Sequence, residues 1–302
     1  MVLKVPNPLI RKKGKVRIIS PSGAVSPSYI NGARAAISAW GYDVSVGKYA
    51  RAVSGRFAGT EQQRIYDLQE ALDSKSLDVI LCSRGGYGLS QIIDKIDFTR
   101  FAEKPKWLVG FSDITVLHNA ISKLNIPSIH GLMAKHLTEW PDENLSATRL
   151  IEILEGVFPV YRLHTHSLNR HGSARGRLIG GNLSVLMSLR DTPFDLNYQD
   201  AILFIEDIAE QPYHIDRMLQ NLRLGGELHQ LAGLIVGHFT DCPEDETMGK
   251  SVKEIILEAT EGTSYPVCFD FPAGHEAQNY PLVLGREIRL DINEHETVID
   301  FS

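Results

Sequence analysis

Cysteine is scarce in this sequence, and the few cysteines show no ligand spacing. The 302 residues include only Cys82, Cys242 and Cys268, an odd number separated by long intervals. Such a set provides neither a disulfide framework nor a structural zinc site. We therefore expect a protein of a reducing compartment that binds no metal.

An excess of basic residues and a long apolar run are also missing. Lys and Arg number 31 against 37 Asp and Glu, and this net charge of −6 disfavours a protein that coats nucleic acid. No apolar stretch approaches transmembrane length, and the first residues lack the basic-then-apolar order of a signal peptide. We expect a cytoplasmic protein whose partners include neither a nucleic-acid polymer nor a membrane.

The composition that is present is typical of globular proteins. Hydrophobic residues make up 43% and charged residues 23% of the chain, as in the soluble globular class. A chain of this length can form two ordinary domains and bury a core without disulfides or metals. Composition alone does not distinguish an enzyme from a binding protein.

The first half of the chain alternates short apolar segments with helical patterns. Buried-strand patterns occur at 15–20, 42–46, 77–82, 107–111 and 126–130. Helical patterns occur between them at 27–40, from Thr60 onward, at 89–96 and at 114–124. This alternation predicts an α/β fold with a doubly wound parallel sheet, similar to flavodoxin or Rossmann domains.

The second half has more closely spaced strands and fewer helices. Strand patterns occur at 176–179, 201–205, 231–236, 267–271, 282–284, 288–292 and 297–301. Helical patterns occur at 183–189, 215–222 and 252–259. They predict a second, mixed α/β domain rich in strands. We therefore divide the chain into an N-terminal domain (1–150), a crossover (151–175) and a C-terminal domain (176–302).

Ser112 is the first candidate for chemistry, because ligands of open parallel sheets bind beyond the carboxyl ends of the strands. It directly follows the strand 107–111 and precedes a helical pattern, as a nucleophile on a tight strand-to-helix turn does. The match is partial, since Gly110 is present but Ile114 stands where a second glycine would be. The alternative interpretation is a helix N-cap, a common role of serine.

A glycine-rich turn, Arg84-Gly85-Gly86, follows the strand 77–82. Glycine is common in such turns for backbone reasons alone. Alternatively, its backbone amides bind a phosphate or a developing oxyanion. The segment has neither the G-x-G-x-x-G pattern nor a P-loop lysine, so no dinucleotide or P-loop cofactor is expected.

A nucleophilic serine requires a base, and the base requires an orienting carboxylate. Of the 11 histidines, His275 stands out because it follows an apolar strand in a turn that contains proline and glycine. Glu206 and Asp207 end the strand 201–205, either as a solvated loop start or as placed carboxylates. The order Ser112, Glu206, His275 is compatible with a triad, but spacing does not establish its geometry.

These segments together resemble the L,D-carboxypeptidase family of serine peptidases, which includes muramoyltetrapeptide carboxypeptidases and microcin C immunity peptidases. The matching segments span most of the chain and lie at 19–23, 59–60, 83–88, 109–118, 130–131, 176–183, 203–207, 215–219 and 272–275. The sequence differs from the commonest family pattern at Leu132, where proline is usual, and at His214, where arginine is usual. Neither position touches the triad.

The resemblance implies a Ser–His–Glu triad formed by Ser112, His275 and Glu206. The serine comes from the first domain and the other two residues from the second. Asp207 and Glu210 are nearby acids that fit the family pattern less well.

The resemblance also implies an oxyanion hole of backbone amides, here Asp113 and a glycine of the turn, Gly86 or Gly85. Arg84 borders this site and is a candidate for binding a terminal carboxylate. A structural salt bridge is the alternative role for Arg84.

The implied substrate is a small peptide, a muropeptide tetrapeptide that loses its terminal D-alanine at an L,D bond during peptidoglycan recycling. The implied reaction proceeds through an acyl-enzyme without a cofactor, and the family suggests a homodimer. One alternative within the family is a peptidase that detoxifies peptidyl-nucleotides of the microcin C type. An alternative of another class is a non-catalytic protein that holds a phosphate or nucleotide at residues 84–88.

Overall fold

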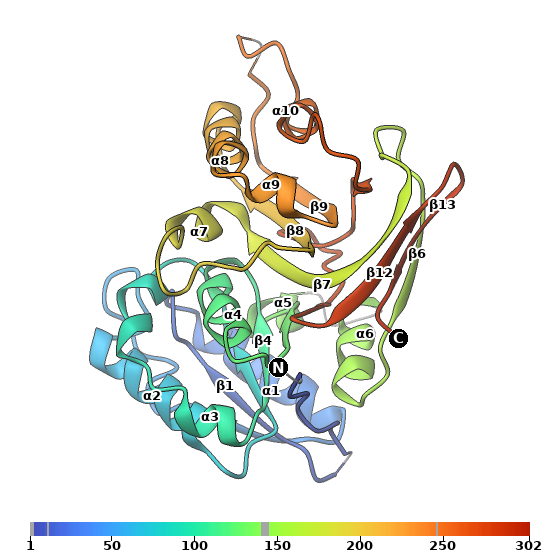
Figure 1. Cartoon of the computed structure of the whole chain (residues 1–302). Coiled ribbons are helices and arrows are strands. Elements are labelled where there is room, and N and C mark those ends of the chain that lie inside the picture. The colour runs from blue at the N-terminus through green and yellow to red at the C-terminus, as the bar shows by residue number, and fades with distance from the viewer. Residues whose placement is uncertain (1–2, 11, 140–144, 246) are drawn as a thin grey trace. The chain divides into compact units, whose positions relative to one another are not determined.

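The computed structural model describes residues 3–10, 12–139, 145–245 and 247–302. The chain divides into two units, each with its own sheet (Figure 1). The N-terminal unit comprises the residues up to 157 together with 280–284, and the C-terminal unit comprises 158–279 with 285–302. Each unit is described by itself.

The N-terminal unit contains a six-stranded sheet with the order β11-β5-β4-β3-β1-β2. Its strands are β1 (Lys15–Ile19), β2 (Asp43–Val46), β3 (Val79–Cys82), β4 (Trp107–Gly110), β5 (Ser128–His130) and β11 (Leu282–Leu284). The first five pair in parallel, which confirms the predicted parallel sheet. Strand β11 pairs antiparallel with β5, a placement that the sequence pattern did not predict.

Helices cover both faces of this sheet. They are α1 (Pro27–Ala39), α2 (Glu61–Asp73), α3 (Thr99–Glu103), α4 (Thr115–Ser122), α5 (Ala134–Glu139) and α6 (Leu145–Leu154). From β1 the chain passes through α1 to β2 on one side and then through α2 to β3 on the other. Right-handed connections in opposite directions place α1 and α2 on opposite faces, so the sheet is doubly wound.

The prediction of one α-helix at 89–96 was wrong. The segment forms two 3₁₀ turns, η1 (Leu89–Gln91) and η2 (Ile93–Lys95), which are separated by Ile92 at φ −125°. The helical spacing predicted burial correctly, since the apolar side chains of the segment are buried. Hydrogen bonds from outside the segment hold this geometry: Arg64 donates to Gly88 and Gln91, and Leu89 donates to Asp113.

The C-terminal unit contains a seven-stranded sheet with the order β10-β9-β8-β7-β12-β13-β6. Its strands are β6 (Val160–His164), β7 (Gly172–Asn182), β8 (Ala201–Ile208), β9 (Gly233–Thr240), β10 (Val267–Cys268), β12 (Glu287–Ile292) and β13 (Glu296–Asp300). Strands β7 to β10 pair in parallel and the others antiparallel, which confirms the predicted mixed domain. Strand β6 and the start of β7 come from the segment that we expected to be a crossover.

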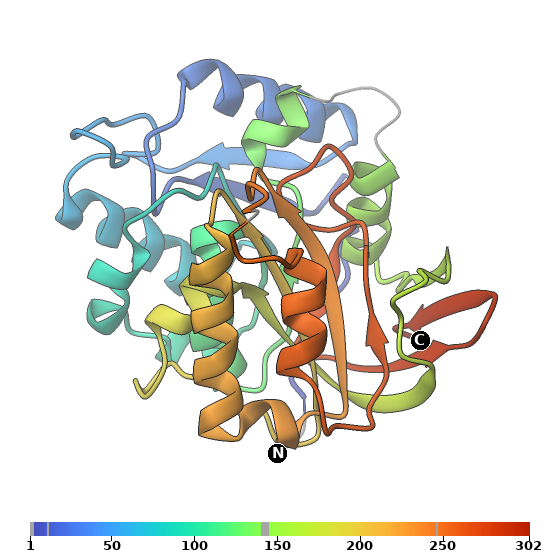
Figure 2. The ribbon, with the colours of Figure 1, turned by 90° about the horizontal axis from the view of Figure 1, so that it is seen from above.

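Two separate apolar layers stabilise this second sheet. The helices of the unit are α7 (Leu183–Ser188), α8 (Pro212–Gly225), α9 (Glu227–Gln230) and α10 (Val252–Ala259). Helices α8 and α10 lie side by side (Figure 2), and their buried apolar residues join those of β8 and β9 in one core cluster. An aromatic cluster of Tyr161, Phe204, Phe271 and Phe301 forms the other layer. Among the described residues, no helix is long and apolar enough to cross a membrane.

Replacement of Gly180 by alanine tests how tightly β7 and β8 are packed. Gly180 has φ +125°, and a Cβ atom there would lie 1.9 Å from the carbonyl oxygen of Phe204. We expect Gly180→Ala to lower the free energy of unfolding by about 3 kcal/mol or more, because both the backbone and the contact are incompatible with a side chain. The control Gly262→Ala, with φ +78° and open space around it, should lose only about 1 kcal/mol. Urea unfolding measures both, and equal losses would contradict this account.

Candidate active site

Three loops meet at the carboxyl edge of the N-terminal sheet. They follow β1, β3 and β4 and contain Ser22, Gly85 and Ser112 respectively. The backbone N–H of Gly23 donates to the carbonyl of Gly85 at 3.2 Å, which ties the first two loops together. This edge includes the point between β1 and β3 where the strand order reverses, the usual ligand position in doubly wound sheets.

Ser112 adopts a backbone conformation that few non-glycine residues take. Its φ is +65°, in the left-handed region, and its side chain is half-buried. Phe111 is the N-cap residue of the turn η3 (Ser112–Ile114), and Ser112 is the first residue of that turn. The hydroxyl therefore does not occupy the capping position that we considered for it. A strained serine at a strand-to-helix turn has the backbone geometry of a nucleophile elbow.

The two glycines of the loop after β3, Gly85 and Gly86, are required for different reasons. A Cβ atom on Gly85 would lie 2.7 Å from Cβ and 2.9 Å from Oγ of Ser112, so only glycine allows this approach. Gly86 has φ +116°, which a side chain would strain. The glycine turn thus lies directly beside Ser112 and within reach of the backbone N of Asp113.

The carboxylate of Asp113 joins all three loops. It is 4% exposed and accepts a hydrogen bond from Oγ of Ser22 at 2.5 Å and from the backbone N–H of Leu89 at 3.1 Å. Burial raises the pKa of Asp113, while these two hydrogen bonds and Arg64 oppose that shift. The side chain therefore fixes the backbone of the residue that follows Ser112.

Two further residues support this edge. Nε2 of the buried His118 lies 2.9 Å from the carbonyl of Gly110 and Nδ1 lies 2.8 Å from Oγ of Ser128, and burial lowers the pKa of His118 to about 4. His118 is therefore a neutral structural residue. Arg84 is half-buried and donates to the carbonyl of Ala24 at 3.1 Å. Its guanidinium has further donors for an anion.

In the C-terminal unit, His275 and Glu206 form a hydrogen-bonded pair. Nδ1 of His275 lies 2.7 Å from Oε2 of Glu206, whose side chain is fully buried, while the imidazole is 15% exposed. Because a carboxylate accepts this bond, Nδ1 carries the proton, and in the neutral ring Nε2 is the nitrogen that can accept one. The pair is thus arranged as the orienting acid and the base of a triad.

A β-bulge positions Glu206. Ile205 pairs with Val236 but Asp207 pairs with Phe239, so two residues of β9 lie opposite this single glutamate. Bulges often re-aim a side chain beside an active site. The base is held from the other side, because the N–H of Gly274 donates to Asn279 at 3.2 Å and a Cβ atom on Gly274 would lie 3.3 Å from Oε2 of Glu206.

The neighbouring acids have other partners. Asp207 accepts hydrogen bonds from the side chain of Asn182 at 2.8 Å and from the backbone of Ser184 at 2.9 Å. Burial, and then the negative charge of Glu206, raise the pKa of Asp207 to about 6. Glu210 contacts Nδ1 of His214 at 3.1 Å. Successive strand residues point to opposite faces, which accounts for the different partners of Glu206 and Asp207.

The structure therefore groups the predicted residues into two sets. Ser112, Asp113, Gly85 and Gly86 lie together in the N-terminal unit, and Glu206 and His275 lie together in the C-terminal unit. Across the described ranges, no cluster of His, Cys, Asp or Glu could hold a metal ion. The hydrogen bonds of the Asp113 carboxylate and the Asn182–Asp207 contact were not predicted, because polar residues at strand ends do not reveal their partners.

Comparison with known proteins identifies the family. The model of the LD-carboxypeptidase N-terminal domain matches residues 16–131, and that of the LD-carboxypeptidase C-terminal domain matches residues 175–290. The murein tetrapeptide carboxypeptidase of Pseudomonas aeruginosa is 32% identical over 293 residues, which cover 93% of this chain and 94% of that protein.

Solved structures agree with this assignment. The muramoyltetrapeptide carboxypeptidase of Oxalobacter formigenes is 27% identical with a TM-score of 0.86, covering 95% of this chain and 98% of that one. The microcin C7 self-immunity protein MccF is 20% identical with a TM-score of 0.85 and covers 100% of this chain and 99% of its own, a likeness of fold alone. The resemblance drawn from the motifs is confirmed, and the chain belongs to the LD-carboxypeptidase family.

Proposed function

We propose that this protein is a serine-type L,D-carboxypeptidase that releases the terminal D-alanine of muropeptide tetrapeptides. The hydrogen bond between His275 and the buried Glu206 is the observation that supports this proposal most directly. Family membership and the names of the relatives from Pseudomonas aeruginosa and Oxalobacter formigenes support the substrate class.

In the proposed reaction, Ser112 is the nucleophile that attacks the carbonyl of the L,D peptide bond. Nε2 of His275 takes the hydroxyl proton, and Glu206 stabilises the imidazolium that forms. The carbonyl oxygen becomes an oxyanion that accepts hydrogen bonds from the backbone N–H of Asp113 and of Gly86 or Gly85.

The second half of the reaction restores the enzyme. The imidazolium gives its proton to the nitrogen of D-alanine as the peptide bond breaks, which leaves an ester on Ser112. Water then attacks this acyl-enzyme, His275 accepts one of its protons, and that proton returns to the serine oxygen. Arg84 is our candidate for binding the terminal carboxylate of the substrate, because it borders the glycine turn.

We also infer that the protein acts in the cytoplasm, in the recycling of peptidoglycan, as a homodimer. All three cysteines are free thiols, two of them buried, which suits a reducing compartment. The homodimer and the recycling role follow from the family resemblance.

Replacing the nucleophile tests the reaction. We expect Ser112→Ala to reduce D-alanine release from a muropeptide tetrapeptide by at least about 1,000-fold, because no hydroxyl remains to form the ester. The control Ser122→Ala, at the end of α4, should retain activity. D-Alanine is measured by chromatography, and activity of Ser112→Ala at the level of the control would refute the nucleophile.

Turnover of a peptidyl-nucleotide in preference to the muropeptide would instead support the alternative substrate.

The pH profile tests the base. A reaction that needs a neutral imidazole should lose kcat/KM as the pH falls below about 6 to 7. We expect a tenfold loss for each pH unit below that range while circular dichroism shows an unchanged fold. A flat profile between pH 5 and 8 would argue against His275 as the base.

The Asp113 carboxylate should act as a positioning group. Asp113→Asn weakens the bonds to Ser22 and Leu89 and loosens the backbone that presents the oxyanion donor, so we expect kcat to fall about 10- to 100-fold. KM should change less than threefold, and Ser22→Ala should show a smaller effect in the same direction. The control Asp94→Asn alters an exposed carboxylate of the same unit. A change confined to stability or to KM would contradict this role.

A further inference from the structure

Arg64 is a buried arginine to which the proposed reaction gives no role. It lies on α2, in the N-terminal unit, and is 2% exposed. An arginine is almost never buried this deeply unless its charge is balanced, because removing a guanidinium from water is costly. The contacts of Arg64 therefore identify what offsets that cost.

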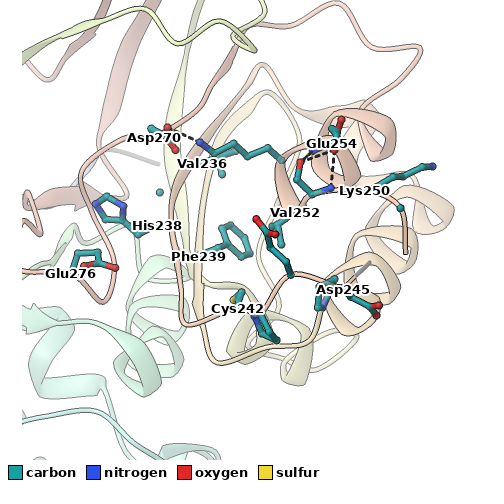
Figure 3. Close-up of a pocket in the computed structure, with 17 residues that line it drawn as sticks. Val236, His238, Phe239, Cys242, Asp245, Lys250, Val252, Glu254, Asp270 and Glu276 are labelled. Carbon is teal, nitrogen blue, oxygen red and sulfur yellow. Dashed lines mark hydrogen bonds and ion pairs between the residues drawn. The ribbon is translucent and has the colours of Figure 1, made fainter. Parts of the chain in front are cut away.

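A direct ion pair is the usual partner of a partly buried cation. In the pocket of the C-terminal unit in Figure 3, Nζ of Lys253 lies 2.6 Å from a carboxylate oxygen of Asp270. Arg64 is more buried than this lysine, yet its hydrogen bonds within the described residues go to uncharged oxygen atoms. These are the carbonyl of Gly88 at 2.8 Å, the carbonyl of Pro21 at 3.4 Å and the side-chain amide of Gln91 at 3.1 Å.

The peptide group between Gly88 and Leu89 lies between two opposite charges. Its carbonyl oxygen accepts from Nη1 of Arg64 at 2.8 Å, and its N–H donates to Oδ2 of Asp113 at 3.1 Å. The C=O and N–H of a trans peptide point in opposite directions. The guanidinium is therefore at the negative end of this peptide dipole and the carboxylate is at the positive end. One buried peptide group stabilises both charges.

A second set of contacts joins the same two side chains to the loop after β1. Arg64 donates to the carbonyl of Pro21, and Asp113 accepts from Oγ of Ser22. Burial lowers the pKa of Arg64, and the negative charges of Glu61 and Asp113 oppose this shift. Burial raises the pKa of Asp113, and the charge of Arg64 is among the influences that oppose that shift. Each buried charge thus favours the ionised form of the other.

The backbone at Gly88 leaves the space that the guanidinium occupies. Gly88 has φ +138°, and a Cβ atom there would lie 2.5 Å from Nη1 of Arg64 and 3.0 Å from Cδ1 of Phe57. The ring centroid of Phe57 lies 4.8 Å from Cζ of Arg64, as in a cation–π contact. A side chain at position 88 would displace one or both groups. The end of the glycine turn and the guanidinium are therefore closely packed against each other.

We propose that Arg64 is a positioning residue of this enzyme, which acts with Asp113 through the Gly88–Leu89 peptide to hold the glycine turn in place. Gly85 and Gly86 precede this peptide, and the backbone N of Asp113 would lie 3.2 Å from a Cβ atom on Gly85. The two charges thus fix the spacing of the proposed oxyanion donors before substrate binds. This inference rests on the proposed carboxypeptidase function.

Removing the charge of Arg64 tests the proposal. Arg64→Met has a long side chain but no charge and no donor, so the carbonyl of Gly88 loses its partner. We expect kcat for D-alanine release from a muropeptide tetrapeptide to fall about 10- to 100-fold while KM changes less than about threefold, because displaced oxyanion donors affect the transition state most. Arg64→Lys keeps the charge and a donor, and its kcat should stay within about fivefold of the wild type.

A double-mutant cycle tests whether Arg64 acts together with Asp113. If both act through one peptide group, the second substitution adds little once the first has been made. We expect kcat of the double variant Arg64→Met, Asp113→Asn to lie within about threefold of the slower single variant, whereas independent losses would multiply. The matched control Arg100→Met changes an exposed arginine of α3, and it should leave kcat and KM unchanged in either background.

The fold and the activity of each variant are measured on the same sample. Circular dichroism and urea unfolding establish that the variant is folded under the assay conditions, and Arg64→Gln replaces Arg64→Met in the cycle if the latter does not fold. An unchanged kcat, a loss confined to KM or to stability, or losses that multiply in the cycle would overturn the role of Arg64 while the carboxypeptidase function stands. Failure of the wild type to release D-alanine overturns both proposals.

Discussion

The bond between Glu206 and His275 is the interaction on which the arrangement of the proposed acid and base in the C-terminal unit depends. A fully buried carboxylate is costly unless hydrogen bonds compensate for its lost hydration. Oε2 of Glu206 accepts from the imidazole, whereas Oε1 has no partner among the described residues. Loss of the histidine would leave this carboxylate without its hydrogen bond, so the pair stabilises the loop that presents the base. The bulge in β9, the close approach of Gly274 and the Asn279 contact all lie beside that bond.

In the N-terminal unit, the residues around Ser112 also depend on one energetically costly feature. Here the costly feature is the left-handed backbone of Ser112, and it persists only because surrounding contacts determine it. Gly85 leaves room for the serine, while the buried Asp113 carboxylate joins the loops after β1, β3 and β4. Strain at one residue is therefore offset by hydrogen bonds to its neighbour. Each set of residues lies within its own unit, at the carboxyl ends of parallel strands, where backbone N–H groups and loops are available to a ligand.

The sequence predicted the parallel N-terminal sheet because buried strands and amphipathic helices have distinct periods. The prediction of a helix at residues 89–96 was wrong, because the spacing of apolar residues there indicates burial and not helix geometry. Long-range hydrogen bonds with Arg64 and Asp113 fix the two turns instead. The sequence also could not predict that residues 282–284 add an antiparallel edge strand to the first sheet, because pairing partners are not encoded locally. Ser112, Glu206 and His275 were predicted from motifs, whereas the bulge at Glu206 and the carboxylate contacts of Asp113 required coordinates.

Because the proposed catalytic residues are divided between the two units, neither unit is expected to be active without the other. The proposed nucleophile and oxyanion donors belong to one unit, and the proposed acid and base belong to the other. Neither set can complete acyl transfer alone, since a serine without a base is a weak nucleophile and a base without a serine has no group to activate. The rigid local geometry of each set reduces the reorganisation that the reaction requires within each unit. Substrate selectivity can then reside in features of one unit alone, without any change to the residues that perform the proposed chemistry.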